Sequence, residues 1–214
     1  MLDNALSILH RCFESSHRRT YPPNTTIINA GDYSNSLYYI ASGSVSVILE
    51  DQDGHEMVLA YLNKGEFFGE IGLFDESHER SAWVRSRSRT EIAQLSYERL
   101  MELTKTDPDV ILALLMMMSL RIRDTSRKLG DLAFLDVAGR IARALLELCE
   151  QPDAKKVPAG TAVRITRQEL GRIVGCSREM ASRVLRSMED RGMVDIDGKT
   201  VTILHHSDML PSFK

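Results

Sequence analysis

The sequence predicts an α+β protein with a β-rich N-terminal part, a long helix, and a C-terminal helix-turn-helix closed by a hairpin. Short runs of β-branched and aromatic residues, separated by glycine-containing turns, occupy residues 25–86. Apolar positions then repeat at alternating spacings of four and three, which is typical of a two-stranded coiled coil. Beyond them, a helix-capping sequence precedes a second amphipathic helix, as in a helix-turn-helix.

The chain has 214 residues, which is room for two modest domains. We divide it into residues 1–106 with the β-rich domain and flanking short helices, residues 107–135 with the long helix and a hinge, and residues 136–214 with the C-terminal domain and tail. The net charge is -3. Residues 138–191, however, hold eleven Lys/Arg and seven Asp/Glu, a balance of +4 that leaves -7 for the rest. A basic module beside an acidic one indicates nucleic-acid binding at the C-terminal end.

Several classes of protein are not expected. No apolar run is long enough to span a bilayer and the N-terminus lacks the features of a signal peptide, so we expect a cytoplasmic protein without a membrane partner. The three cysteines Cys12, Cys149 and Cys176 form no Cys-x-x-Cys, which argues against a disulfide framework or a zinc site. The motifs assemble no Ser/His/Asp, Cys/His or metal-ligand set, so we expect no enzyme, no catalytic residue and no metal.

The N-terminal elements are predicted from short patterns. Residues 5–14 are compatible with a short helix. The turn at residues 51–54, Asp-Gln-Asp-Gly, is typical of a hairpin. Many short strands at this spacing predict a barrel or a sandwich. The expected strands are residues 25–28, 36–41, 44–49, 56–62 and 82–86.

Residues 67–81, Phe-Phe-Gly-Glu-Ile-Gly-Leu-Phe-Asp-Glu-Ser-His-Glu-Arg-Ser, have the chemistry of a phosphate and sugar cradle. Two glycines three residues apart let backbone amides approach an anion. The glutamate offers a carboxylate to a ribose hydroxyl, and the arginine and serine offer a guanidinium and a hydroxyl to a phosphate. A β-turn with a surface Glu/Arg pair is the alternative. The candidate ligand contacts are Gly69, Glu70, Ile71, Gly72, Arg80 and Ser81.

A helix over residues 97–104 is followed by a much longer one from about Pro108. The longer helix carries an a/d heptad seam, and charged residues leave only a narrow apolar stripe in its second half. A buried core helix would suit residues 111–118, but the narrow stripe favours a coiled coil and therefore a homodimer. The seam consists of Ile111, Leu115, Met118, Ile122, Thr125, Leu129 and Leu132.

The heptad breaks at residues 130–136. Residues 138–150 are predicted as an amphipathic helix. A surface loop at residues 151–160, with two prolines and a glycine, and a strand at residues 161–165 follow. The final hairpin, a wing, is expected from residues 194–196 and 200–204 around an Asp-Gly turn.

The helix-turn-helix begins with a capping box in which Thr166 is the N-cap and Glu169 follows three residues later. Its first helix is expected to end near Gly175, and a second runs to about Arg191 with its apolar residues facing inward. The outer face of this second helix carries Arg178, Glu179 and Arg183, whose side chains can read bases. Thr166 and Arg167 at the start of the first helix and Ser177 in the turn are the candidates for holding phosphates.

The chemistry of base reading explains the choice of Arg178, Glu179 and Arg183. Arginine donates two hydrogen bonds to guanine O6 and N7, and glutamate accepts from the cytosine amino group in the major groove. An exposed helix laced with i, i+4 salt bridges is the alternative for this pattern. The basic module and the capped helix before it favour DNA.

Three stretches carry a resemblance to one family. These are the Gly-Glu-x-x-Gly-Leu-Phe and Glu-Arg-Ser-Ala run of the cradle, residues 132–141, and residues 165–183. They resemble the bacterial cAMP receptor/fumarate-nitrate regulator family of transcription regulators, and the resemblance covers residues 17–204. It implies a β-roll that encloses cAMP as an allosteric effector, and a hinge at residues 130–136.

On the long helix, the resemblance implies that Thr125 contacts the adenine in its own subunit and Ser126 the adenine in the partner subunit. A polar residue that sets the register of the coiled coil is the alternative for Thr125. The resemblance further implies a homodimer that reads a palindromic TGTGA-type site in double-stranded DNA, mainly as an activator.

RNA polymerase is the other implied partner. It would contact residues 151–160 and a basic patch near His17, Arg19 and Arg99. Residues 155–157 depart from the usual loop of the family, and so does the tail at residues 205–214, where two adjacent histidines are expected to be a frayed end. Two alternatives remain: the same DNA-binding role with cGMP or cyclic di-GMP as effector, or a cyclic-nucleotide-binding regulatory subunit of an enzyme, which would lack a helix-turn-helix.

Overall fold

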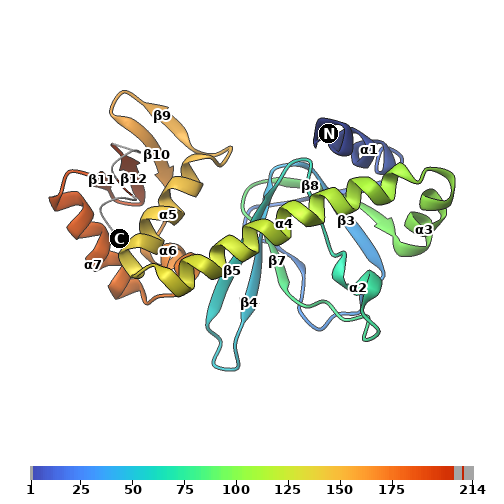
Figure 1. Ribbon diagram of the computed structural model, residues 1–214, viewed down its shortest axis with the longest axis horizontal. Coiled ribbons are helices and arrows are strands. Elements are labelled where there is room, and N and C mark those ends of the chain that lie inside the picture. The colour runs from blue at the N-terminus through green and yellow to red at the C-terminus, as the bar shows by residue number, and fades with distance from the viewer. Residues whose placement is uncertain (1, 205–208, 210–214) are drawn as a thin grey trace. The chain divides into compact units, whose positions relative to one another are not determined.

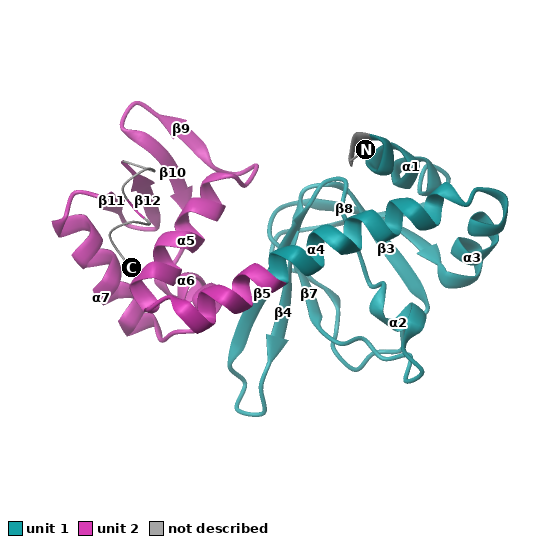
Figure 2. Cartoon of the chain, in the orientation of Figure 1, with its two compact units in different colours: residues 1–125 teal, residues 126–214 magenta. Residues whose placement is uncertain are grey.

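The computed structural model describes residues 2–204 and 209. The chain forms two compact units, residues 1–125 and residues 126–214 (Figure 1, Figure 2). The first unit holds most of the strands and the second holds a helix-turn-helix with a small sheet, so the α+β class is confirmed. Within the described ranges, no helix combines the length and the apolarity needed to cross a membrane.

The first unit contains two four-stranded antiparallel sheets, ordered β1-β8-β3-β6 and β2-β7-β4-β5. Apolar side chains from both sheets form one core cluster that includes Ile40, Val45, Phe68 and Val84. The expected sandwich of short strands is therefore present. The strands are β1 His17–Tyr21, β2 Thr26–Ile28, β3 Ser36–Ser42, β4 Ser44–Glu50, β5 Glu56–Asn63, β6 Phe67–Phe68, β7 Trp83–Ser86 and β8 Thr90–Ser96.

Strand β3 shows why the first sheet is covered on both faces. Successive side chains of a strand point to opposite faces. Leu37 and Tyr39 belong to a cluster with the helices, whereas Ile40 belongs to the cluster between the sheets. The helical cluster includes Leu9 and Leu100. The helices of this unit are α1 Leu2–Cys12, α2 Ile71–Phe74, α3 Tyr97–Thr106 and the first part of α4 Asp109–Phe134.

Helix α4 has one buried face and one exposed apolar face. Val110, Ala113 and Met117 are buried in the helical cluster. Of the heptad positions, Met118 is partly buried and packs against this cluster, whereas Leu115 and Leu129 are 58% and 68% exposed. The helix also continues through Gly130 to Phe134, so residues 130–136, where we expected the heptad to break, begin inside the helix. A glycine inside a helix costs about 1 kcal/mol, which neighbouring turns can offset.

The second unit is a winged helix-turn-helix. Its sheet has the order β11-β12-β10-β9 and its helices share a core with Ile141, Leu145, Leu170 and Leu185. Gly175 ends α6 in the left-handed conformation with φ of 69°, as the turn requires. The elements are α5 Val137–Cys149, β9 Lys155–Val157, β10 Gly160–Arg164, α6 Arg167–Val174, α7 Arg178–Asp190, β11 Val194–Asp197 and β12 Thr200–Ile203.

One prediction in this unit needs correction. The expected loop at residues 151–160 contains the strand β9, which pairs with β10 in antiparallel register. All three residues of β9 are exposed, so no alternation of apolar side chains marks it in the sequence. The tail histidines His205 and His206 lie outside the described residues.

Candidate functional site

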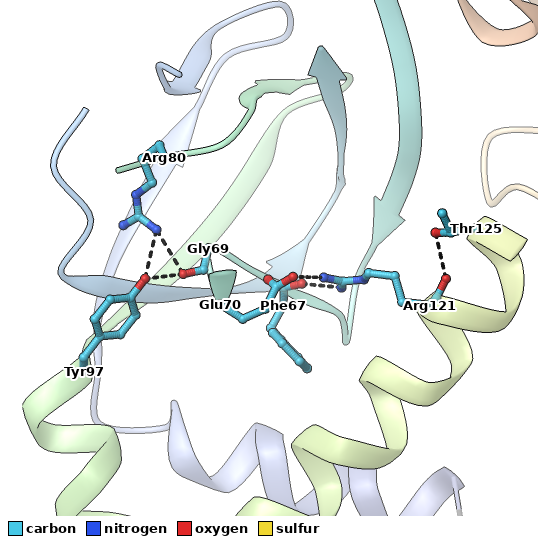
Figure 3. A network of polar contacts seen from close by, with 7 residues as sticks. All are labelled: Phe67, Gly69, Glu70, Arg80, Tyr97, Arg121 and Thr125. Carbon is cyan, nitrogen blue, oxygen red and sulfur yellow. Dashed lines mark hydrogen bonds and ion pairs between the residues drawn. The ribbon is translucent and has the colours of Figure 1, made fainter. Parts of the chain in front are cut away.

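The predicted cradle begins with β6, continues through α2 and ends just after Arg80. Figure 3 shows Gly69, Glu70 and Arg80 of this segment. Gly69 has φ of +84°, and a Cβ on it would lie 2.6 Å from Arg80 Nη1. A Cβ on Gly72 would collide with Ser34 Oγ. We expected the two glycines to admit an anion. The structure supplies a further reason for glycine at these two positions: the side chains of Arg80 and Ser34 already fill the space that a Cβ would need.

Arg80 is a buried cation. It is 7% exposed, and its Nη2 donates to Ser36 O at 2.9 Å. Its Nη1 donates to Gly69 O at 3.0 Å and to Tyr97 Oη at 3.3 Å. The guanidinium also lies over the ring of Tyr38, 5.3 Å from its centroid. A cation held in a low-dielectric environment interacts more strongly with a phosphate than one in water.

Glu70 forms an ion pair with Arg121 of α4, a residue that we did not predict from the sequence. Arg121 Nη1 donates to Glu70 Oε1 at 2.9 Å, and Arg121 Nη2 donates to Phe67 O at 2.6 Å. The two paired side chains are only 21% and 15% exposed. In the sequence, Arg121 is one of many charges on the long helix. Its position one turn before Thr125 is the signal that could have singled it out.

The remaining predicted contacts are more exposed. Ser81 and Ile71 are exposed beside the buried members of the cradle. Thr125 is exposed on α4, and its Oγ1 donates to Arg121 O at 2.9 Å. Glu70, Arg121 and Thr125 therefore form one connected group (Figure 3). Ser126 is exposed and is the first residue of the second unit.

Two further groups shape the electrostatics of this region. Burial raises the pKa of Glu66, and the Asn63 amide, which donates to its carboxylate at 2.7 Å, opposes that shift together with Arg121. Burial likewise raises the pKa of the Tyr38 phenol, against the opposing charge of Arg80. Tyr38 is therefore a neutral neighbour, so the positive charge of Arg80 is not cancelled by it.

The predicted DNA face lies on α7 and at the start of α6. Arg178, Glu179 and Arg183 are exposed, whereas Ala181 and Leu185 of the same helix are buried. The helix therefore presents its charged side outward and its apolar side to the core. This arrangement can read base edges, since a recognition helix must project long polar side chains into the major groove.

The predicted phosphate contacts also have structural roles. Thr166 caps α6 by accepting from Glu169 N at 3.1 Å, which confirms Thr166 as the N-cap. Ser177 caps α7 by accepting from Met180 N at 3.2 Å. Arg167 Nη1 donates to Gly198 O in the turn of the wing. Helix N-termini bind phosphates well because their amides point outward.

Charged contacts connect the last turns of α4 to α5 within the second unit. Arg127 Nη2 lies 3.0 Å from Glu147 Oε1, and Arg143 Nη2 lies 3.8 Å from Asp131 Oδ1. Arg140 Nη1 donates to Leu135 O at 3.1 Å, and Arg140 Nε donates to Val174 O, at the end of α6, also at 3.1 Å. The segment between α4 and α5 is thereby tied to the helix-turn-helix.

One group of metal-ligand residue types occurs in the described part of the chain. Asp51, Asp53 and His55 lie together in the exposed turn between β4 and β5. The Asp51 carboxylate accepts from the amides of Asp53 and His55, each at 2.9 Å, and these bonds lower its pKa. The hairpin turn therefore accounts for this cluster without a metal.

Each of the two units contains a match to a known domain family. The cyclic nucleotide-binding domain family matches residues 18–107, and the Crp-like helix-turn-helix domain family matches residues 139–209. The cradle thus falls in the first match and α6 and α7 fall in the second, whereas the heptad positions from Ile111 to Leu132 lie between the two matches. A cyclic-nucleotide-binding subunit without a helix-turn-helix is excluded by the second match.

Individual relatives match nearly the whole chain. The cAMP-activated global transcriptional regulator Vfr of Pseudomonas aeruginosa is 51% identical over 92% of this chain and 94% of its own. The cAMP-activated global transcriptional regulator CRP of Salmonella typhimurium is 48% identical over 87% of this chain and 89% of its own. Among solved structures, the c-di-GMP responsive global regulator CLP of Xanthomonas campestris has a TM-score of 0.86 at 46% identity, covering 93% of this chain and 99% of that one.

Proposed function

The chain belongs to the CRP/FNR family of transcription regulators, and we propose that it is a cAMP-dependent homodimer that binds DNA and mainly activates transcription. The observation that carries this proposal is the occurrence in one chain of a buried Arg80 and a paired Glu70 in the cradle, together with an exposed Arg178 on a helix-turn-helix. The relatives that share about half of its residues are named as cAMP-activated. No catalytic step is needed for such a role.

The cradle has a suitable group for each part of cAMP. Arg80 and Ser81 would bind the cyclic phosphate, since charge-assisted hydrogen bonds to a desolvated anion are strong. Glu70, held by Arg121, would accept from the ribose 2′-hydroxyl. All these groups lie in the first unit, and Glu70, Arg80 and Ser81 lie within the residues that the nucleotide-binding family matches.

Thr125 supports adenine as the base. Its hydroxyl donates to Arg121 O, which leaves its oxygen lone pairs to accept. Adenine presents an amino donor at C6, whereas guanine presents a carbonyl acceptor there. An oxygen that can only accept therefore matches cAMP better than cGMP. Ser126 would contact the adenine bound by the partner subunit.

Dimerisation would use the heptad face of α4. Ile111, Leu115, Ile122 and Leu129 are all at least 45% exposed, and they share this face with Thr125. A helix with apolar side chains at a and d positions buries them against a second helix of the same kind. Analytical ultracentrifugation should therefore show a dimer, and charged substitutions at Ile122 and Leu129 should yield a monomer.

DNA binding would follow from two copies of α7. Arg178, Glu179 and Arg183 would read a TGTGA-type half-site in each subunit, and Thr166, Arg167 and Ser177 would hold phosphates. The two-fold symmetry of a dimer implies an inverted repeat. A cytoplasmic location follows from this role in a bacterium.

Activation would require contact with RNA polymerase. Residues 151–160, which include the exposed strand β9, are one candidate surface, and His17, Arg19 and Arg99 are the other. All three basic residues of the second surface are exposed, and Arg99 pairs with Glu102 at 2.8 Å. Transcription assays with substitutions in both surfaces and with DNA binding intact would test this role.

A second effector remains a specific candidate. The regulator CLP, which is named as c-di-GMP responsive, is 46% identical and covers 93% of this chain, so a chain of this similarity is compatible with a different effector. Calorimetric titration of the purified protein with cAMP, cGMP and cyclic di-GMP tests both proposals. Tight binding of cAMP alone, with an increase in operator affinity, supports the first proposal. Tight binding of cyclic di-GMP without cAMP binding would replace it with the second.

A further inference from the structure

The hydroxyl of Tyr97 contacts both Gly69 and Arg80 (Figure 3). It donates to the carbonyl of Gly69, and Arg80 Nη1 donates to it at 3.3 Å. Ser34 Oγ lies 2.6 Å away on another side. A phenol has one proton and two lone pairs. Because the proton goes to Gly69, the lone pairs accept from Arg80 and Ser34, and every hydrogen-bonding position of the hydroxyl is used.

This arrangement fixes the orientation of a cation. The Arg80 guanidinium is planar, and its Nη1 contacts both Gly69 O and the Tyr97 hydroxyl, while Nη2 contacts Ser36 O. Three contacts on two nitrogens determine the plane of the group. Removing the phenol oxygen would leave one backbone carbonyl on each nitrogen, which permits the plane to tilt.

The same hydroxyl fixes a peptide group. The carbonyl and the amide of a trans peptide point in opposite directions. Holding the Gly69 carbonyl toward Tyr97 therefore also sets the direction of the Glu70 amide, which follows it in the chain. Gly69 needs this help, because a glycine with φ of +84° has little conformational preference of its own.

The backbone of Tyr97 is held in place by a helix cap and by a hydrogen bond of its own amide. Tyr97 is the first residue of α3, and Ser96 caps that helix by accepting from Arg99 N at 3.2 Å. The ring packs on the helical core cluster, and the Tyr97 amide donates to Asn35 O at 3.0 Å. The packing of the ring does not depend on its oxygen, so phenylalanine can occupy the site.

We infer that Tyr97 is a positioning residue of the effector site, which orients the Arg80 guanidinium and the Gly69–Glu70 peptide for the cyclic phosphate. It acts through these groups and not by touching the ligand. The inference rests on the proposed function, since it presumes a cyclic nucleotide in the cradle. Ser34, which is 1% exposed, belongs to the same polar network because its Oγ lies 2.6 Å from the Tyr97 hydroxyl.

The test is the variant Tyr97→Phe, with Tyr33→Phe as the matched control because Tyr33 is 72% exposed and lies outside this network. Calorimetry should show an affinity for cAMP lowered roughly tenfold in Tyr97→Phe, the loss typical of one hydrogen bond to a charged group, and unchanged in the control. Far-ultraviolet circular dichroism should show the same fold in both. An unchanged affinity in a folded Tyr97→Phe protein would overturn the inference.

A second readout separates positioning from a general loss of stability. The ratio of affinities for the Rp and Sp phosphorothioate analogues of cAMP reports how the phosphate oxygens meet Arg80. Tyr97→Phe should change this ratio, and in an Arg80→Lys background the effect of Tyr97→Phe on cAMP affinity should shrink. Additive losses together with an unchanged ratio would mean that Tyr97 does not act through Arg80.

Two safeguards keep the outcome decisive. Should Tyr97→Phe fail to fold, Ser34→Ala removes one donor from the same hydroxyl and should produce a smaller loss of the same kind. Titration of the wild type separates a failure of the proposed effector from a failure of the inference about Tyr97. If the wild type binds cyclic di-GMP and not cAMP, the proposed effector is wrong, and the affinities of the variants are then measured for cyclic di-GMP. Absence of any cyclic-nucleotide binding by the wild type contradicts both.

Discussion

The two charged regions of this protein are built in opposite ways. In the effector cradle, Arg80 is 7% exposed and each of its terminal nitrogens already donates to a backbone carbonyl. On the DNA face, Arg178 and Arg183 are exposed on the outer side of α7. A buried site of this kind is ordered before its ligand arrives, whereas an exposed face orders its side chains on binding.

The difference has a physical basis. A small anion must lose its hydration shell to bind tightly, so the groups that replace water have to be in place. A DNA surface is large and irregular, and long flexible side chains can adapt to it at the cost of some conformational entropy. Substitutions in the cradle should therefore alter stability and affinity together, whereas substitutions on α7 should alter affinity alone.

The largest effect is expected for Arg80→Leu. Removing a guanidinium that contacts a buried phosphate should weaken cAMP binding by about 3 kcal/mol or more, which is roughly 100-fold. It also leaves Ser36 O and Gly69 O without this donor, so the free energy of unfolding should fall by about 1 to 3 kcal/mol. Calorimetry and urea unfolding measure the two quantities. A normal cAMP affinity in the folded variant would refute the assignment of Arg80.

Arg178→Ala should give the contrasting result. Operator affinity should fall by about 1 to 3 kcal/mol, with relaxed preference at the matching guanine, because a bidentate contact to one base is lost. The unfolding midpoint should stay unchanged, since the side chain is exposed. Arg167→Ala is the control and should weaken operator and random DNA alike. Equal losses on both kinds of DNA for Arg178→Ala would show that it does not read a base.

Thr125→Ala tests whether the effector region communicates with the DNA face. The variant should still bind cAMP through Arg80 and Glu70, but lose about 1 kcal/mol or more of the gain in operator affinity that cAMP produces. A ligand can shift two states only by its differential affinity for them. Operator affinity is measured with and without saturating cAMP.

The matched control for Thr125→Ala is Thr106→Ala. Thr106 is an exposed helical threonine whose hydroxyl also donates to a carbonyl of its own helix, at 3.0 Å. It lies on α3 and should leave the cAMP response intact. If Thr125→Ala keeps the full response, coupling does not run through this position.

The smallest effect is expected at the ion pairs between α4 and α5. Arg127→Gln and Arg143→Gln should each lower the free energy of unfolding by about 0.2 to 1 kcal/mol, because the paired side chains are partly exposed. The loss should diminish at high salt, unlike the loss from Arg80→Leu. Urea unfolding at low and high salt measures both. Equal salt sensitivity of the Arg80 and Arg127 variants would contradict the contrast between buried and exposed charges.

Sequence patterns predicted those parts of the fold whose signals are local. The N-cap Thr166 and the left-handed Gly175 define α6 within ten residues, so the helix-turn-helix could be placed from residue order alone. The heptad spacing likewise predicted an exposed apolar face on α4. Both signals reflect the geometry of a single helix and need no knowledge of distant contacts.

Strands β1, β6 and β8 were not predicted, because their stability comes from pairing across the sheet. The sequence of β1, His-Arg-Arg-Thr-Tyr, has four exposed residues in five and no apolar alternation. It is ordered by its antiparallel register with β8, where His17 pairs with Gln94. Such pairs are far apart in the chain, so no local window contains the information.

The residues of the candidate site likewise fall into those predicted from local sequence and those that only the tertiary structure identifies. The residue types of Gly69, Glu70 and Arg80 indicated a phosphate and sugar cradle, because their chemistry is visible in a short run of sequence. Arg121 and Tyr97 lie 51 and 28 residues from their cradle partners and look ordinary in their own surroundings. Their selection required the packing of α3 and α4 on the first sheet, since a hydrogen bond forms only where the folded backbone brings donor and acceptor within about 3 Å.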